Sequence, residues 1–240
     1  MQIAARQSFL TGRAGPTPWT NPYVTDGLVA MWDGEWNAGG GVHDPDATTW
    51  ADLSGNGYGM TSQGSADWRT NGAAVNSKAN AFWRGNCSWF REAWSSSAGV
   101  CVESVATLGR GIVFGFGGQN QTWQSFDIDI ATLNASIKRF AFRGATSANT
   151  PVADGSIAII RSWANATNYE ATMAGVTVSG AYSYQNHSGN GFAVGFRGDL
   201  YGTSTRLVNG VIHCVRVYSR ALTAAEVAAN YAIDAARFGL

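Results

Sequence analysis

The sequence is poor in charged residues, and lysine is nearly absent. Asp, Glu, Lys and Arg make up only 13% of the 240 residues, and lysine occurs only at Lys78 and Lys138. An average globular chain carries about 25% charged residues. Acidic and basic residues balance at 16 each, so the formal net charge is zero. Without a basic surface, neither nucleic acid nor an anionic membrane is expected as a partner.

Cysteine and long apolar runs are also scarce. The three cysteines, Cys87, Cys101 and Cys214, do not form a disulfide framework, so buried thiols are expected, with a Cys87–Cys101 bridge as the alternative. No run approaches the ~18 apolar residues of a membrane-spanning helix. The N-terminus lacks the basic start and apolar stretch of a signal peptide. We therefore expect a protein made in the cytoplasm that ends up in a virion or on a surface.

The familiar catalytic motifs are missing as well. The sequence contains no P-loop, no dinucleotide-binding G-x-G-x-x-G between a strand and a helix, and no G-x-S-x-G nucleophile motif. His43, His187 and His213 are far apart and lack the spacing of metal ligands. We therefore expect a protein that is not an enzyme and that requires no cofactor.

Short segments of alternating apolar and polar residues, separated by glycine-rich turns, predict an all-β chain. Phe126, Ile128 and Ile130 alternate with Asp127 and Asp129. In the last predicted strand, alternation places His213 with Val211, Val215 and Val217 on one face, and Cys214 with Ile212, Arg216 and Tyr218 on the other. Such segments recur along the chain and indicate one two-sheet antiparallel β-sandwich.

A helix is predicted directly after this last strand. Thr223 and Glu226 form a T-x-x-E capping box, which marks a helix N-terminus. Val227, Tyr231, Ala235 and Phe238 then recur at helical spacing, which predicts one apolar stripe along the helix.

Both ends of the chain resemble one known family. The run GVIHCVRVYSRALTAAEV (Gly210 to Val227), with DGLVAMWD (Asp26 to Asp33) and WADLSGNG (Trp50 to Gly57), is similar to laminin-G-like jelly-roll domains of the concanavalin A-like lectin/glucanase group. This resemblance implies a jelly-roll sandwich with a short C-terminal helix and with glycan or cell-surface binding. The first and last strands are expected to pair. His213 and Cys214 stand where the family often has acidic residues, which puts a shared ion site on this strand in doubt.

The proposed domain covers residues 23–240, and residues 1–22 are predicted to form an extended arm. Pro16, Pro18 and Pro22 keep this segment out of a sheet interior. The arm still carries apolar residues, among them Phe9 and Leu10. We expect it either to fray or to dock on a neighbouring subunit or virion protein.

Two sets of side chains are candidates for ligand binding. Trp36, Trp68 and Trp123 lie in segments that read as polar loops, where aromatic faces can stack on sugars or simply cap the sandwich. Asp127 and Asp129 share one strand face about 7 Å apart, the separation of a glycosidase carboxylate pair. The glucanases of this fold use E-x-D-x-x-E, which this strand does not match. A Ca²⁺ site or a solvated outer face are the other interpretations of the pair.

The sequence therefore leads to a ranked set of functions. The first is a non-catalytic, lectin-like recognition or adhesion module that binds a glycan or cell-surface polysaccharide. The second is a structural component of a bacteriophage virion, such as a head decoration or fibre protein. The third is a glycoside hydrolase of the same fold.

Overall fold

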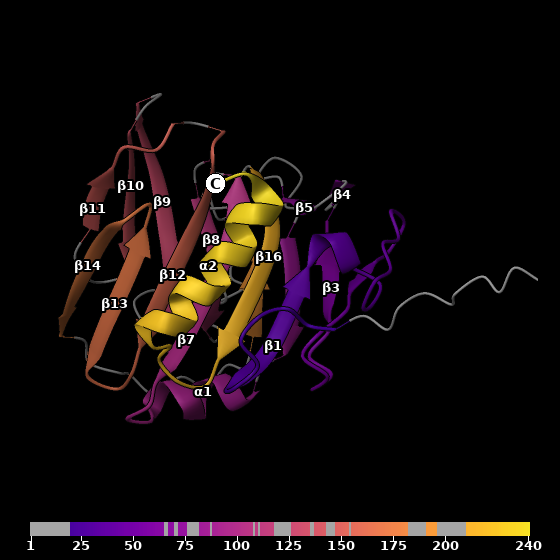
Figure 1. Cartoon of the computed structure of the whole chain (residues 1–240), viewed down its shortest axis with the longest axis horizontal. Coiled ribbons are helices and arrows are strands. Elements are labelled where there is room, and N and C mark those ends of the chain that lie inside the picture. Colours follow the sequence, from indigo (N-terminus) through magenta and orange to yellow (C-terminus); the bar gives the residue numbers. More distant parts are fainter. Residues whose placement is uncertain are drawn as a thin grey trace, which may run out of the picture.

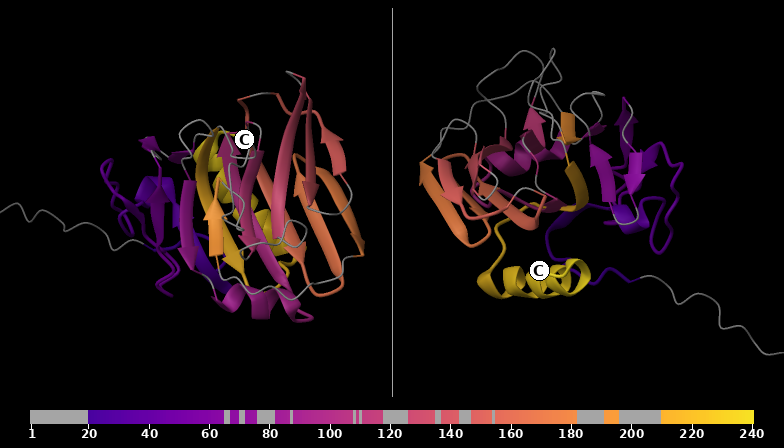
Figure 2. Two further views of the ribbon diagram at one scale, coloured as in Figure 1. Left: turned by 180° about the vertical axis from the view of Figure 1, so that it is seen from behind. Right: turned by 90° about the horizontal axis from the view of Figure 1, so that it is seen from above.

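The computed structural model describes residues 20–64, 67–69, 72–75, 82–86, 88–107, 109, 111–117, 126–134, 137–142, 147–153, 155–181, 191–195 and 210–240. In this part of the chain, two antiparallel sheets of eight strands each form a β-sandwich with one C-terminal helix, as predicted (Figures 1 and 2). None of the helices described is long and apolar enough to cross a membrane.

The first sheet contains, in spatial order, β14 (Val176–Ala181), β13 (Asn168–Met173), β12 (Ile157–Ala164), β7 (Val100–Thr107), β16 (Gly210–Tyr218), β5 (Gly72–Val75) and β4 (Asp67–Arg69), and β1 (Leu28–Asp33) also pairs with β16. The second sheet contains β11 (Ser147–Thr150), β10 (Ile137–Phe142), β9 (Phe126–Asn134), β8 (Gly111–Gly117), β15 (Gly191–Val194), β6 (Phe82–Asn86), β3 (Met60–Gln63) and β2 (Thr49–Trp50). The helices described are η1 (Gly34–Trp36), α1 (Ser88–Ser95) and α2 (Ala224–Phe238).

The predicted pairing of the first and last strands is confirmed. Strand β1 lies antiparallel to β16 from Leu28 opposite Tyr218 to Asp33 opposite Cys214. Strand β5 continues along the same edge of β16, so the chain after β1 passes close to the start of β5. A side chain on Gly34 would collide with the Cα atom of Gly72 at this junction. Glycine is therefore required where the two strands share one edge.

The turn between β2 and β3 also forms as the sequence indicates. The Asp52 carboxylate accepts hydrogen bonds from the backbone N–H groups of Met31, Ser54 and Tyr58, at 2.9 Å each. Gly55 and Gly57 adopt positive φ angles of 88° and 81°, which residues with a Cβ rarely adopt. One carboxylate thus joins the turn to the first strand.

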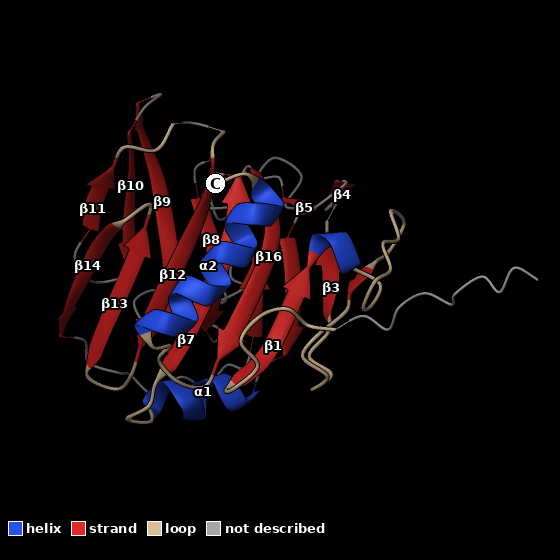
Figure 3. Ribbon diagram, in the orientation of Figure 1, coloured by secondary structure: helices blue, strands red, loops and turns tan. Residues whose placement is uncertain are grey.

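Aromatic side chains fill the space between the sheets. Trp32 of the first sheet stacks on Phe192 of the second at a centroid distance of 5.3 Å. Helix α1 closes one end of the sandwich (Figure 3), where Phe90 and Trp94 are fully buried one helical turn apart. The i, i+4 spacing of these two aromatics matches the helix that Ser88–Ser95 forms.

Trp68 belongs to this aromatic packing. It lies on strand β4 and not in a loop as the sequence suggested. Its ring centroid is 4.5 Å from that of Trp83 and 5.2 Å from that of Trp50, and its indole N–H donates to the Ala47 carbonyl oxygen at 2.7 Å. The Trp68 side chain thus extends the core to the edge of the first sheet.

A β-bulge changes the predicted faces of the last strand. The register with β7 shifts between Ile212 and Cys214, which leaves His213 as an extra residue. Ile212 therefore joins Val215 in the core between the sheets. His213 instead contacts Phe238 of α2 at a centroid distance of 5.1 Å. The prediction that His213 shares a face with Val215, and Ile212 with Cys214, is wrong for this reason.

Helix α2 covers the outer face of the first sheet (Figure 2). Its capping box is confirmed, since the Thr223 hydroxyl accepts from the Glu226 N–H and the Glu226 carboxylate accepts from the Thr223 N–H. The predicted apolar stripe is wrong in one respect. Tyr231 is 52% exposed, whereas the buried residues of the helix are Asn230 and Asp234. The helix therefore binds the sheet mainly through polar groups.

The polar residues of α2 bind the side chain of Arg216, which is fully buried. Its guanidinium makes two hydrogen bonds to the Asp234 carboxylate, at 2.9 and 2.5 Å, and a third to Glu103 at 3.3 Å. Asn230 donates to the same Glu103 oxygen at 2.7 Å and to the Tyr218 hydroxyl at 3.0 Å. These contacts connect β7, β16 and α2.

The segment before β1 completes the network. The Tyr23 ring lies under the Arg216 guanidinium at 4.0 Å, and its hydroxyl donates to Asp234 at 2.8 Å. Burial raises the pKa of Tyr23, so this hydroxyl keeps its proton. Arg237 donates to the Tyr23 hydroxyl and to both oxygens of Asp33, the last residue of β1. Burial raises the pKa of Asp33, and the bonds from Arg237 oppose that shift.

We predict that Asp234→Ala lowers the free energy of unfolding by about 3–5 kcal/mol, because it leaves the buried Arg216 without its main counter-charge. Chemical denaturation monitored by circular dichroism measures this loss. Asp67→Ala is the matched control, since Asp67 pairs with Arg69 at the surface and the change should stay within about 0.5 kcal/mol. An equally small loss for both variants would contradict the importance of the network.

We also predict that Trp68→Ala lowers the free energy of unfolding by about 3 kcal/mol, because it removes the ring that packs on Trp50 and Trp83. The same denaturation measurement applies. Trp36→Ala provides the comparison, since Trp36 packs on the Arg237 guanidinium at 4.5 Å, outside the aromatic core, and its loss should cost less. Equal losses for both would place Trp68 outside the core.

Candidate functional site

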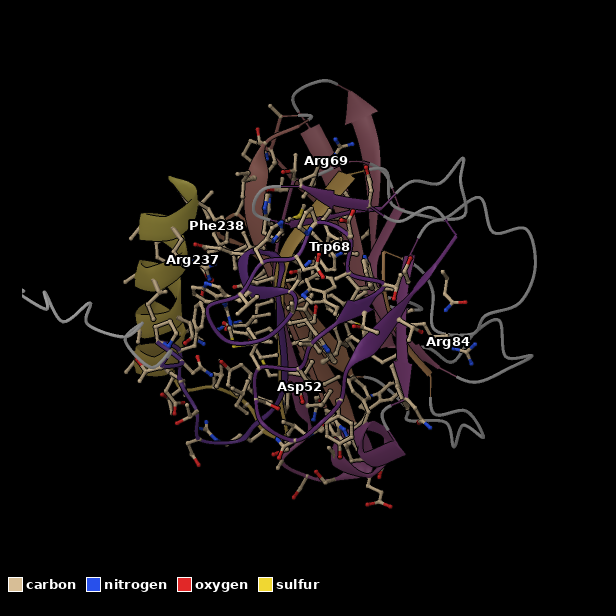
Figure 4. The ribbon with its side chains drawn as sticks, turned by 90° about the vertical axis from the view of Figure 1, so that its right-hand side faces the viewer. Asp52, Trp68, Arg69, Arg84, Arg237 and Phe238 are labelled. Atoms are coloured by element: carbon tan, nitrogen blue, oxygen red, sulfur yellow. The ribbon has the colours of Figure 1, made fainter. Side chains whose placement is uncertain are left out.

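The outer face of the second sheet carries a polar hollow of about 420 Å³. It lies over strands β3, β6 and β15 and is lined by Gly59, Thr61, Gln63, Arg84, Gly85, Asn86 and Gly191. Its volume falls within the ~300–1,000 Å³ typical of ligand pockets. In Figure 4, Arg84 lies on the side of the molecule away from α2, whereas Arg237 and Phe238 are the last two residues of that helix.

The strand pattern explains why these side chains point outward. In β6, Trp83 is fully buried in the core, while its neighbour Arg84 is exposed. In β3, Met60 is buried and Thr61 is exposed in the same way. Because successive residues of a strand alternate between faces, Thr61, Arg84 and Asn86 all lie on the outer surface.

Glycine and alanine lie next to the polar side chains of the hollow on neighbouring strands. In the strand register, Arg84 lies opposite Thr61 on one side and Ala193 on the other. Asn86 lies opposite Gly191, which in turn lies opposite Gly117 of β8. Gly191 leaves the backbone opposite Asn86 without a side chain, so a ligand can approach the sheet closely at this point.

This combination of groups suits a hydroxyl-rich ligand. The guanidinium of Arg84 offers donors only, the amide of Asn86 offers donors and an acceptor, and the Thr61 hydroxyl offers both. Gln63 already donates to the Thr61 hydroxyl at 3.3 Å, so the polar groups form a connected surface. Sugars bind through such arrays of hydrogen bonds.

The predicted aspartates lie further along the same sheet. Asp127 pairs with Gly115, which pairs with Ala193, so one cross-strand row leads from Asp127 to Arg84. Asp129 lies two residues further along β9. Their positions alternate with Ile130, which is buried in the core, as predicted. Among the residues described, no group of three or more His, Cys, Asp or Glu is placed to hold a metal ion.

The predicted tryptophans are not gathered at the hollow. Trp36 lies in η1 under Arg237, and Trp68 packs in the aromatic core. Trp123 lies outside the described residues. Sequence reasoning missed the surface around Arg84 and Asn86, although the apolar–polar alternation of FWRGN contains the signal for it.

Other reactive side chains are held in structural roles. Glu103 accepts hydrogen bonds from Arg216 and Asn230. Cys101 and Cys214 are free and buried, which confirms the expectation of buried thiols for these two, and burial raises the pKa of both. A thiol with a raised pKa is a poor nucleophile at neutral pH. Cys87 lies outside the described residues.

Comparison with known proteins finds similarity in structure only. No family model matches the sequence, and no curated protein matches it. The sialidase of Trypanosoma rangeli in complex with sialic acid matches with a TM-score of 0.61 at 12% identity, over 85% of this chain and 32% of the sialidase chain. The chain therefore spans about a third of the length of that enzyme.

Two further solved structures share the fold. Domain 4 of a GH43 extracellular arabinanase from Geobacillus stearothermophilus, in complex with arabinotriose, matches with a TM-score of 0.57 at 15% identity, over 83% of this chain and 96% of that domain. The binding domain of botulinum neurotoxin serotype D/C matches with a TM-score of 0.54 at 8% identity, over 86% of this chain and 52% of that chain. At such low identities, the shared feature is the β-sandwich.

Proposed function

We propose that this protein is a non-catalytic carbohydrate-binding module and that the hollow around Arg84 and Asn86 binds the sugar. The observation that carries the proposal is the array of hydroxyl, guanidinium and amide groups beside glycine on the outer face of the second sheet. The laminin-G-like resemblance at the two ends of the chain supports the same role. Proteins of similar fold have been solved with arabinotriose and with sialic acid.

In this proposal, recognition rests on hydrogen bonds. A bidentate guanidinium such as that of Arg84 binds a pair of adjacent sugar hydroxyls or a sugar carboxylate, and Asn86 and Thr61 fix the orientation of the ring. The bare backbone at Gly191, opposite Asn86, allows the ring to lie close to the strands. The module supplies binding, and any catalysis belongs to another protein or domain.

A calcium ion is an additional proposal for the same face. Asp127 and Asp129 are hard oxygen donors, which Ca²⁺ prefers together with carbonyl oxygens and water. Binding that requires Ca²⁺ would assign these two residues as ligands.

We predict that the purified protein binds a subset of glycans on an array and that Arg84→Ala weakens this binding at least about tenfold, because a charge-assisted hydrogen bond is lost. Titration of the best glycan by isothermal calorimetry, with Ca²⁺ and with chelator, measures the change. Arg69→Ala is the matched control, because Arg69 is an exposed arginine on the first sheet.

Two outcomes would count against the proposal. Equal affinities for the Arg84→Ala variant and the wild type would remove the hollow as the site. A failure to bind any glycan, with or without Ca²⁺, would favour a structural subunit that uses the sandwich for assembly. Binding lost only in Trp36→Ala or Trp123→Ala would move the site to the tryptophans.

A further inference from the structure

A second groove lies on the opposite side of the molecule, between helix α2 and strands β12 and β13. Its volume is about 430 Å³, and its walls are largely apolar, with Ile157 and Ile159 from β12 and Val227 from α2. Tyr231 and Leu240 stand at its rim with 52% and 41% of their surfaces exposed. Large apolar side chains left exposed beside a groove are typical of a binding surface.

The floor of this groove carries negative charge. Glu103 and Asp234 both line it. Both carboxylates pair with a single guanidinium, that of Arg216, which leaves one negative charge in excess at this floor. The low dielectric under the helix strengthens the attraction of this excess charge for a cation.

Arg161 also lines the groove, but it does not neutralise this charge. Its guanidinium forms an ion pair with Glu170 of β13 at 3.0 Å, and Glu170 does not line the groove. The groove as a whole therefore combines apolar walls with a net negative floor. Such a surface fits a peptide segment that carries both arginine and large apolar side chains.

The chain itself contains a segment of this composition. Residues 1–19 include Arg6 and Arg13 and no acidic residue, together with Ile3, Phe9 and Leu10. We propose that residues 1–19 of one copy bind the groove of a second copy. An arginine of this arm lies over Glu103, and its apolar side chains pack against Tyr231 and Leu240.

The position of the arm favours binding to the groove of a second copy rather than to the groove of its own chain. The chain enters the described part at Thr20 on the β1 side of α2, where Tyr23 bonds to Asp234 and the Val24 N–H bonds to Asn230. Strands β12 and β13 lie on the other side of the helix (Figure 1). An arm returning to its own groove would have to cross α2.

The prolines of the arm also make binding to its own groove unfavourable. Pro16, Pro18 and Pro22 favour extended polyproline geometry, with about 3.1 Å per residue. In that geometry the ten steps from Leu10 to Thr20 would span roughly 30 Å, well beyond the ~10–12 Å diameter of a helix. An extended arm of this length would reach past its own helix to a second copy.

This pairing is independent of sugar binding. The groove lies on the outer face of the first sheet, and the hollow lies on the outer face of the second. Figure 4 shows Arg84 on the side away from α2. A pair of copies joined by their arms would therefore expose two hollows, which raises the avidity for a repeating polymer.

Sedimentation velocity over a range of concentrations tests the proposal on the full chain. We expect a reversible dimer whose dissociation constant rises at least about tenfold in Tyr231→Asp and in the double variant Arg6→Ala/Arg13→Ala. Val42→Asp is the control, because Val42 is 53% exposed in a loop of the other half of the chain and should leave the dimer unchanged. Thermal melting of each variant verifies that it is folded.

A cysteine-pairing experiment separates the two ways of filling the groove. A mixture of the single variants Leu10→Cys and Tyr231→Cys should form a disulfide-linked dimer under mild oxidation, above the background of the wild type. A monomer at all concentrations, a dimer insensitive to Tyr231→Asp, or a dimer that survives deletion of residues 1–19 would each overturn the proposal. An internal disulfide in the double variant, with none between mixed single variants, would assign the arm to its own groove and also overturn it.

Discussion

The buried guanidinium of Arg216 sets the arrangement of the outer layer of this protein. A charge without solvent is tolerated only where counter-charges and hydrogen bonds surround it. Asp234 of α2 and Glu103 of β7 supply these, and Tyr23 covers the remaining face of the guanidinium. The helix, two central strands and the segment before β1 therefore meet at one side chain. Removing any of them leaves part of the buried guanidinium without a partner, so we expect these elements to be lost together.

Because α2 is held on one sheet by these buried charges, the two outer faces of the sandwich differ. The outer face of the first sheet is covered by α2, carries the buried ion pairs of Arg216, and forms one wall of the groove beside the helix. The outer face of the second sheet keeps short, polar and glycine-rich positions around Arg84 and Asn86. Our two proposals accordingly place assembly on the first face and ligand binding on the second. An aromatic core that includes Trp32 and Phe192 keeps the two faces at a fixed separation.

The features that follow local rules were predictable from the sequence. Alternation gave the strands, Thr223 and Glu226 gave the start of α2, and the motif around Asp52 gave its turn. Features that depend on partners distant in sequence were not predictable. The bulge at His213 has no local signal, and the buried face of α2 depends on Arg216 lying opposite it on the sheet. The hollow draws its residues from three strands distant in sequence, so the alternation of FWRGN marks only one of its walls.

Native-state hydrogen exchange tests the central claim, the locking of α2 by buried charges, most directly. If the network joins the helix to the sheet, backbone amides from Val227 to Ala235 should exchange only through the same global unfolding as those of β16. Their exchange free energies should then converge with those of Val215 and Val217 at low denaturant concentration. Exchange of α2 through a local opening several kcal/mol below that of β16 would contradict the account.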